Sequence, residues 1–178
     1  MIQRITIPKD ITLSISKNIS KSVFLLSNKN GSLLLTIPSF ILVSWNKSNR
    51  ALFLVNKCHT NYNLLTLTYK RIVNVIHGLS RGFNKKLKLV GRGFKYTAHK
   101  NTFFLNVGFS HIFKFTTNGP LKISKFSKSE FNLVSLSQQQ VNQKSFILQK
   151  LKFPDSYKGK GVCSSKPIII KEGKKKMY

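Results

Sequence analysis

A glycine- and lysine-rich stretch near the end of the chain, PDSYKGKG at residues 154–161, contains the residue types that bind phosphate. Its glycines alternate with Lys158 and Lys160 directly after a proline-initiated turn. Glycine tolerates positive φ and lets backbone amides approach an anion, while the lysine ammonium groups supply positive charge. Tyr157 adds an aromatic face that either stacks on a base or sugar or anchors the turn. The competing interpretation of so short a motif is a solvated surface loop.

The charge of the whole chain favours the phosphate interpretation. The 178 residues include 31 Lys and Arg but only four Asp and Glu, which gives a formal net charge of +27. Such self-repulsion destabilises a compact chain unless a polyanion neutralises it, and a nucleic acid gains counterion entropy when it does so. An anionic membrane surface is the alternative, but no basic amphipathic helix with a clean cationic face is evident. We therefore expect RNA as the partner and no membrane insertion.

The sequence does not favour catalysis or cofactor binding. The four acids are scattered, and no GxSxG, HExxH or Walker motif occurs. Cys58 and Cys163 lie far apart without a CxxC motif, and His59 beside Cys58 gives too few ligands for a structural zinc. We predict reduced thiols, no metal, no cofactor, no small-molecule substrate and no enzymatic activity. An RNA-modifying or RNA-processing enzyme stays open as an alternative, as does a membrane-surface binder.

Three further features have both a structural and a functional interpretation. The GRG at residues 91–93 lacks the third glycine and the helix of a dinucleotide loop, so it predicts a strand kink or bulge that exposes Arg92 to an RNA backbone. His77 and His111 are interpreted as structural. The phenylalanines between Phe103 and Phe115 resemble a base-stacking platform only in composition, and their strand spacing favours the core.

The first half of the chain reads as strands followed by a helix. Apolar or alternating runs are separated by turns, of which NKNG at residues 28–31 is the clearest hairpin signal. From about Asn61, apolar residues recur every three or four positions, which predicts an amphipathic helix that Gly82 stops or hinges. The expected strands are residues 11–15, 23–27, 33–37, 41–45 and 51–55.

The second half repeats this order. Its helix is expected to begin with a capping box of Ser137 and Gln140 and to end before Pro154. The expected strands are residues 86–90, 94–99, 102–109, 112–115, 121–126 and 131–136. The repeat predicts an α+β fold of two tandem, duplicated small domains, each a mostly antiparallel sheet with a helix packed on it. We expect domains at 1–82 and 83–152 and a basic RNA-binding tail at 153–178, loosely packed apart from a short apolar run at 167–170.

Two segments resemble a known family. PDSYKGKGV with the later KEGKKK, and the run GFNKKLKLVGRGFKYTAHKNTFFLNVGFSH, are similar to the universal large-subunit ribosomal protein family number six (L-six). The resemblance implies a structural constituent of the large ribosomal subunit that binds large-subunit rRNA near the sarcin-ricin region, beside neighbouring ribosomal proteins. The first 60 residues support it only by position and strand pattern.

The resemblance implies which residues bind RNA. The family's RNA-binding loop corresponds to Tyr157, Lys158, Gly159, Lys160 and Gly161, and its basic tail corresponds to Lys171, Lys174, Lys175 and Lys176. Composition adds further candidates, because 20 of the Lys and Arg residues fall in 83–178 and 11 in 1–82. These further RNA-binding candidates are Lys85, Lys86, Arg92, Lys152 and Lys166. The chain departs from the family at Phe153 and Cys163, where relatives commonly carry arginine, so those two contacts are not carried over.

Amino-acid usage suggests where the chain works. Lysine greatly outnumbers arginine, asparagine and phenylalanine are frequent, and alanine occurs only at Ala51 and Ala98. Arginine is the better phosphate clamp, so physical chemistry does not demand this pattern, whereas an AT-rich organelle genome would. The opening MIQRITIPKD resembles neither a signal nor a transit peptide. We therefore expect a mitochondrial ribosome, with a plastid or the bacterial cytoplasm as alternatives.

Overall fold

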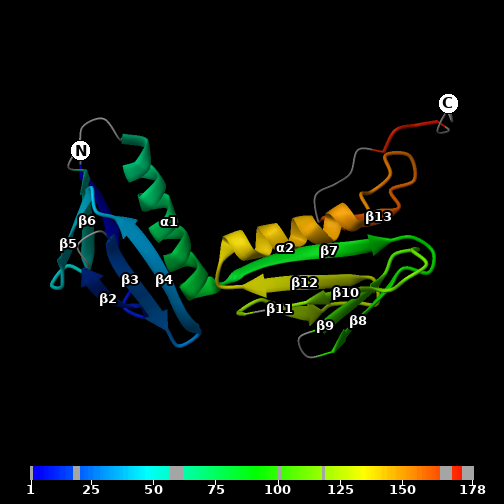
Figure 1. The fold of residues 1–178 in the computed structure, drawn as a ribbon, viewed down its shortest axis with the longest axis horizontal. Coiled ribbons are helices and arrows are strands. Elements are labelled where there is room, and N and C mark those ends of the chain that lie inside the picture. The colour runs from blue at the N-terminus through cyan, green and yellow to red at the C-terminus, as the bar shows by residue number, and fades with distance from the viewer. Residues whose placement is uncertain are drawn as a thin grey trace. The chain divides into compact units, whose positions relative to one another are not determined.

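The fold combines antiparallel sheets with helices, as the sequence predicts, and a computed structural model describes residues 2–17, 21–56, 62–99, 102–117, 119–164 and 170–173. The chain divides into two compact units, Met1–Gly82 and Phe83–Tyr178 (Figure 1). In each unit a helix follows or interrupts a set of strands and packs on them. The α+β fold class is therefore confirmed.

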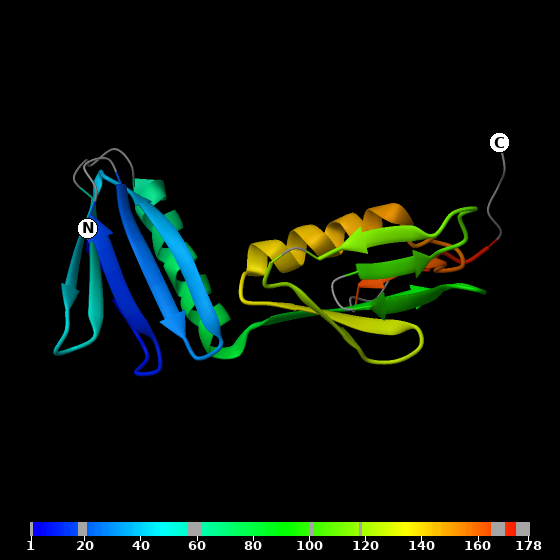
Figure 2. The same ribbon diagram turned by 60° about the horizontal axis from the view of Figure 1, so that its bottom comes forward.

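Unit 1 contains two three-stranded antiparallel sheets, of order β1-β6-β5 and β2-β3-β4. The helix α1 (Tyr62–Arg81) packs against β3, β4 and β6, and Figure 2 shows it running alongside β3 and β4. The sequence did not predict β1, which carries Gln and Arg at its centre. The strands are β1 (Ile2–Thr6), β2 (Thr12–Lys17), β3 (Lys21–Asn28), β4 (Gly31–Pro38), β5 (Ile41–Asn46) and β6 (Ala51–Asn56).

The apolar stripe of α1 forms part of the core of unit 1. Leu65, Ile72 and Leu79 are at most 1% exposed, which follows from their spacing of about two turns along one helix face. Gly82 has φ +71° and donates its amide to the carbonyl of Gly78 at 2.9 Å. This left-handed residue satisfies a carbonyl of the last turn, so Gly82 stops the helix as predicted.

The predicted NKNG hairpin joins β3 to β4 and also holds the end of α1. Asn28 pairs with Gly31 in the register of the two strands. The side-chain amide of Asn28 donates to the carbonyl of Leu79 at 3.1 Å, and that of Asn30 reaches the same oxygen at 3.4 Å. Two side chains of one turn therefore bind a carbonyl that the helix itself leaves without an amide partner.

Unit 2 contains a sheet of order β10-β9-β8 and a four-stranded sheet of order β11-β12-β7-β13, all antiparallel. The rings of Tyr96, Phe103 and Phe131 meet between the two sheets, with centroids 4.7–5.4 Å apart. The strands are β7 (Phe83–Val90), β8 (Lys95–His99), β9 (Thr102–Asn106), β10 (Phe113–Thr116), β11 (Lys122–Lys125), β12 (Glu130–Ser135) and β13 (Gly161–Ser164).

The helix α2 (Gln138–Leu151) packs against β7, β12 and β13, but not as the sequence predicts in detail. Ser137 is the N-cap residue and makes no side-chain capping hydrogen bond. The hydroxyl of Ser135 instead bonds the Oε1 atom of Gln140 at 3.1 Å. Val141, Ser145 and Leu148 form the buried face. The predicted capping box is therefore wrong, because the preceding strand supplies the serine.

The strand β13 lies within the stretch expected to be a loosely packed tail. It pairs with β7 along residues 161–164, and Val162 is fully buried while Cys163 is 5% exposed. Part of the segment after residue 152 is therefore core, and the ordered strand precedes the expected apolar run, of which residues 167–169 lie outside the described residues. In the sheet, β13 covers the edge of β7 that β12 leaves open.

Candidate nucleic-acid interface

The pairing of β13 with β7 brings two loops of unit 2 to the same end. Val90 at the end of β7 lies opposite Gly161 at the start of β13 in the antiparallel register. The turn at residues 91–93 therefore leaves the sheet beside the loop at residues 155–160 (Figure 1). The amide of Val162 donates to the carbonyl of Lys152 at 2.9 Å, which fixes the end of α2 there as well.

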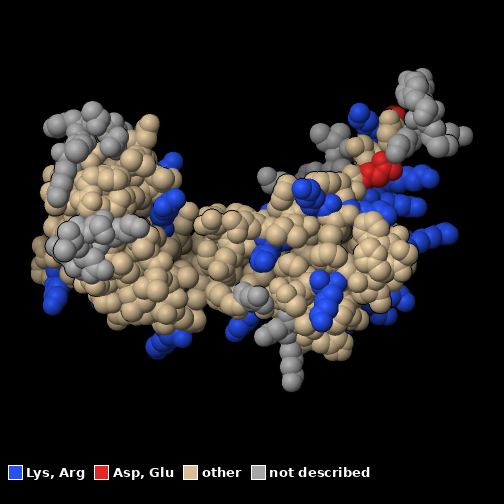
Figure 3. All heavy atoms as spheres, in the orientation of Figure 1, with Lys and Arg blue, Asp and Glu red and all other residues tan. Residues whose placement is uncertain are grey.

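We call this region the basic end and define it by Arg92, Lys152, Lys158 and Lys160. Arg92, Lys158 and Lys160 are exposed, and Lys152 is half-buried. Figure 3 shows Lys and Arg side chains projecting from this part of unit 2, with a patch of acidic atoms beside some of them. Residues from three separate segments therefore present one sign of charge, and such a cluster attracts a polyanion.

Internal hydrogen bonds close the loop at residues 155–160. The amide of Asp155 donates to the carbonyl of Lys160 at 3.0 Å, and the amide of Gly159 donates to the carbonyl of Asp155 at 2.8 Å. Gly159 has φ +65°, which favours glycine. The amide of Gly159 is therefore used inside the loop, and the positively charged side chains of Lys158 and Lys160 are what the loop presents outward.

Gly161 has a packing role next to this loop. A Cβ atom at this position would lie 2.6 Å from Cα of Pro154 and 2.7 Å from the carbonyl oxygen of Phe153, both backbone atoms that cannot rotate away. Gly161 is buried in β13, and so is Gly159 in the loop. These two predicted RNA-binding glycines shape the loop from inside, while the lysines between them reach the surface.

Lys152 connects the basic end to a group of aromatic rings. Its ammonium nitrogen lies 5.6 Å from the ring centroid of Phe94 and 5.4 Å from that of Phe109. Among the described residues no acidic side chain pairs with it. Cation–π contacts of this length attract the ammonium weakly and leave its charge uncompensated. Lys152 is therefore a cation that is available to a phosphate.

The segment at residues 91–93 is a turn between β7 and β8, which belong to different sheets, rather than the kink or bulge within a strand that the sequence predicts. Gly91 has φ +155°, and a Cβ atom there would lie 2.8 Å from the ring of Phe94. The strand β8 follows this turn, whereas a dinucleotide loop would be followed by a helix. The close approach of Phe94 therefore explains Gly91, and Arg92 is left exposed at the tip.

Lys85 and Lys86 are not part of the basic end, because they lie toward the beginning of β7. The ammonium of Lys86 forms a 2.7 Å ion pair with Glu130 and lies 3.9 Å from the ring centroid of Phe126. Lys88 approaches the same carboxylate at 3.6 Å. The hydrogen bond from Lys86 lowers the pKa of Glu130 below its ordinary value. Lys85 lies 3.5 Å from the side-chain oxygen of Asn142.

The remaining predicted residues are placed as follows. Tyr157 is half-buried and donates its amide to the carboxylate of Asp155 at 3.3 Å, an arrangement that anchors the turn. Lys171 is exposed, and its amide donates to the carbonyl of Ser156 at 2.8 Å, so this part of the tail returns to the loop. The other candidates, Lys166, Lys174, Lys175 and Lys176, lie outside the described residues.

An aromatic pair beside the basic end was not predicted. The rings of Phe109 and His111 lie at 15° to each other with centroids 5.9 Å apart, and both side chains are exposed. Phe103 and Phe115, by contrast, are buried, as the sequence suggests. Strand spacing placed the phenylalanines together in the core, but Phe109 follows the end of β9 and lies on the loop to β10.

Sequence comparison supplies the family. A protein of Methylococcus capsulatus named large ribosomal subunit protein uL6 is 32% identical over 174 residues, which cover 97% of this chain and 96% of the relative. The chain belongs to the uL6 family. The uL6 protein of Neisseria meningitidis serogroup C is 28% identical over 171 residues, 95% of this chain and 96% of the relative. That of Rhodospirillum rubrum is 38% identical over 110 residues, 61% of this chain and 62% of the relative. No protein-family model matches the chain.

This uL6 chain departs from the family pattern at Phe153 and Cys163, and the structure shows where both residues lie. Cys163 lies in β13 and is buried, and burial raises the pKa of its thiol, partly offset by the nearby Lys88. Phe153 is exposed and contacts the ring of Phe146, with centroids 6.4 Å apart. Neither side chain therefore adds charge to the basic end.

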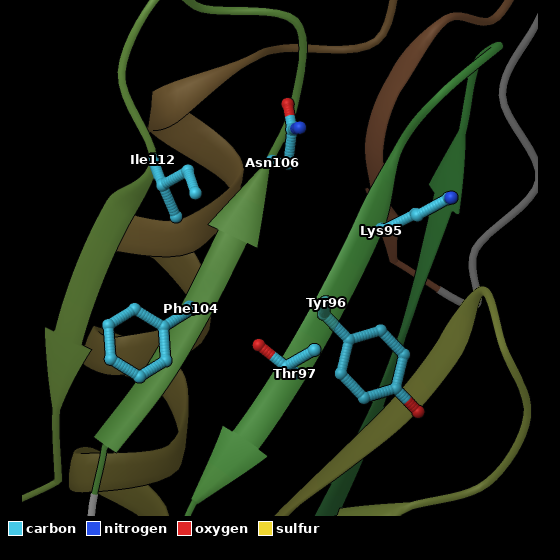
Figure 4. Close-up of a pocket in the computed structure, with 6 residues that line it drawn as sticks. All are labelled: Lys95, Tyr96, Thr97, Phe104, Asn106 and Ile112. Atoms are coloured by element: carbon cyan, nitrogen blue, oxygen red, sulfur yellow. The ribbon is translucent and has the colours of Figure 1, made fainter.

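A shallow hollow on the outer face of β8 and β9 has a volume of about 240 Å³ (Figure 4). Its lining is Lys95, Tyr96, Thr97, Phe104, Asn106 and Ile112. The hydroxyl of Tyr96 donates to backbone carbonyls of Ser127 and Glu130 at 2.5 and 2.8 Å, so it is not free to act in the hollow. In the described part of this uL6 chain, no three His, Cys, Asp or Glu side chains gather as metal ligands, and no helix is long and apolar enough to span a membrane.

Proposed function

We propose that this protein is a structural, non-enzymatic constituent of the large ribosomal subunit, and that the basic end of unit 2 is its principal contact with rRNA. The relatives named large ribosomal subunit protein uL6 support the subunit assignment. The observation that carries the interface is the pairing of β13 with β7, which gathers Arg92, Lys158 and Lys160 at one end of the unit.

Phosphate groups are the chemistry that this end recognises. Its lysines are exposed on a loop that its own backbone hydrogen bonds hold closed, so the loop backbone loses little conformational freedom when RNA binds. Asp155 is the acid of this loop, and its carboxylate is engaged with the amide of Tyr157. We propose the tail residues Lys166, Lys171, Lys174, Lys175 and Lys176 as additional phosphate contacts, since they continue the same positive charge.

Within the subunit, we propose a position near the sarcin-ricin region and contacts with neighbouring large-subunit proteins, as the resemblance implies. The proposal of a mitochondrial ribosome rests only on an amino-acid composition that AT-rich codons would favour. The relatives reported above are bacterial, which gives the mitochondrial location no support and agrees with the bacterial cytoplasm as the alternative. Identifying the genome that encodes the chain decides between these two locations.

The test compares two charge reversals within unit 2. Lys158→Glu with Lys160→Glu changes the basic end, whereas Lys122→Glu with Lys125→Glu makes the same change in net charge on β11, at the opposite edge of the sheet. We expect the first variant to lose rRNA affinity and to sediment poorly with large-subunit particles, and the second to remain close to the unaltered protein. Equal losses would mean that only bulk charge matters.

A further inference from the structure

The exposed ring pair beside the basic end has the geometry of a stacking surface. Phe109 and His111 are nearly parallel at 15°, and their centroid separation of 5.9 Å is that of rings displaced sideways. Lateral displacement leaves part of each face uncovered, and both side chains are exposed. Phe109 is 42% exposed, so a partner can reach its ring.

The surroundings of the pair distinguish a nucleic-acid base from an apolar protein partner. The ammonium of Lys152 lies 5.4 Å from the centroid of Phe109 and has no acidic partner among the described residues. A flat aromatic surface beside an uncompensated cation matches a nucleotide, whose base stacks while its phosphate meets the ammonium. An apolar protein surface would have to desolvate that cation without compensating its charge.

A second pair of His and Phe rings in the same unit is packed edge to face and serves as a comparison. His99 and Phe104 lie edge to face at 70°, with centroids 6.2 Å apart. Perpendicular rings present no continuous flat surface. The two pairs have the same composition and lie on neighbouring strands and loops of one sheet, so the second is a matched control for the first.

We infer that Phe109 and His111 form a stacking platform for an unpaired RNA base, with Lys152 binding the adjacent phosphate. This inference rests on the proposed RNA-binding function and adds a preference for unpaired nucleotides to it. Stacking is tolerant of base identity, because every base has a π face. The platform therefore selects single-stranded or bulged RNA over continuous duplex, while the lysines of the basic end bind both.

The experiment measures binding of the full chain to two RNA probes. One is a single-stranded oligouridine that carries a single 2-aminopurine, whose fluorescence falls when the base stacks. The other is the same strand paired with its complement. The variant Phe109→Leu/His111→Ala is compared with Phe104→Leu/His99→Ala and with His111→Ala alone, after thermal unfolding has verified that each is folded.

We expect the Phe109→Leu/His111→Ala variant to bind the single strand roughly 5-fold to 100-fold more weakly than the unaltered protein, to quench 2-aminopurine less and to bind the duplex unchanged. His111→Ala should show a smaller loss in the same direction, and the edge-to-face control should show none. Unchanged single-strand affinity would overturn the inference, as would an equal loss on both probes. Weaker incorporation into the subunit with unchanged RNA binding would assign the rings to a protein contact and would also overturn it.

These outcomes separate the platform from the proposed function. If the unaltered protein binds neither probe and does not sediment with large-subunit particles, the proposed function itself fails. If it sediments and binds both probes equally without a change in fluorescence, only the platform is refuted.

Discussion

A Cβ atom on Gly161 would lie 2.6 Å from Cα of Pro154. The first residue of β13 therefore lies against the backbone just before the loop at residues 155–160, and the strand and the loop can occupy these positions only if residue 161 is glycine. The φ of +153° at Gly161 adds a backbone reason for the same residue.

Gly161→Ala should therefore destabilise unit 2 more than Gly159→Ala. Gly159 also has a positive φ, but a Cβ atom there would meet nothing within 4 Å, so its replacement costs about 1–2 kcal/mol from the backbone conformation alone. The additional loss in Gly161→Ala comes from the clash with Pro154. Urea denaturation measures both changes in the free energy of unfolding, and equal losses would contradict the importance of this contact.

Truncation should separate folding from RNA binding. A chain ending at residue 164 keeps β13 and should melt like the full chain, whereas a chain ending at residue 160 loses the buried Val162 and exposes an edge of β7. Burial of one such side chain contributes about 1.5–3 kcal/mol. Thermal unfolding followed by circular dichroism tests this, and equal melting of the two truncated chains would mean that β13 adds nothing to stability.

The chain ending at residue 164 should also bind rRNA more weakly, because it lacks five lysines and one glutamate. Filter binding of the folded truncated chain measures this loss independently of its stability. Unchanged affinity would restrict the RNA-binding surface to the basic end.

Salt dependence should reveal how many phosphates the basic end engages. Each phosphate contact contributes about 0.7–0.9 to the slope of log affinity against log salt concentration. Lys158→Ala with Lys160→Ala should reduce that slope by about 1.4–1.8 if each lysine binds one phosphate. Titrations at several potassium chloride concentrations measure it. A slope that does not change would remove both lysines from the interface.

The Lys86–Glu130 ion pair should make stability depend on pH. The pKa of Glu130 is lowered in the folded state, so ionised Glu130 favours folding above its ordinary pKa of 4.5, and this stability is lost as the pH falls through the folded-state pKa. Glu130→Gln cannot titrate. The melting temperature of the unaltered protein should therefore fall more steeply below pH 4.5 than that of the variant, and parallel curves would contradict the effect.

The two units should differ in RNA binding when separated. We propose that the two units divide after Gly82, the residue with positive φ that ends α1. A fragment from residue 83 onward should retain most rRNA affinity, while residues 1–82 should bind weakly because most Lys and Arg lie in the second half. Filter binding of the two folded fragments compares them, and similar affinities would place the interface elsewhere.

Local patterns predicted most of the strands and both helices, because alternation and three- to four-residue spacing reflect burial directly. The strand β13 was missed, since its partner β7 is distant in the sequence. The ion pair of Lys86 with Glu130 was missed for the same reason, because it depends on strand pairing. The carboxylate of Glu130 becomes a neighbour of Lys86 only through the register of β7 and β12.

The sequence predicted the charged residues of the candidate site, but it did not predict how the loop and the rings around them are arranged. Lys158 and Lys160 were identified from a short motif, and both are exposed at the surface. The glycines were expected to open the backbone to phosphate, whereas the amide of Gly159 is consumed within the loop. Phe109 could not be distinguished from the core phenylalanines by spacing, because the end of β9 decides which rings turn outward.

The distance in sequence between β7 and β13 has a consequence for biosynthesis. Unit 1 is complete once residue 82 has been made, and most of its strands pair with the next strand along the chain. In unit 2, β7 is made first and its partner β13 last among the described strands. One edge of β7 therefore stays unpaired while residues 91–160 are translated, and its open amides and carbonyls are available to incorrect partners until β13 emerges.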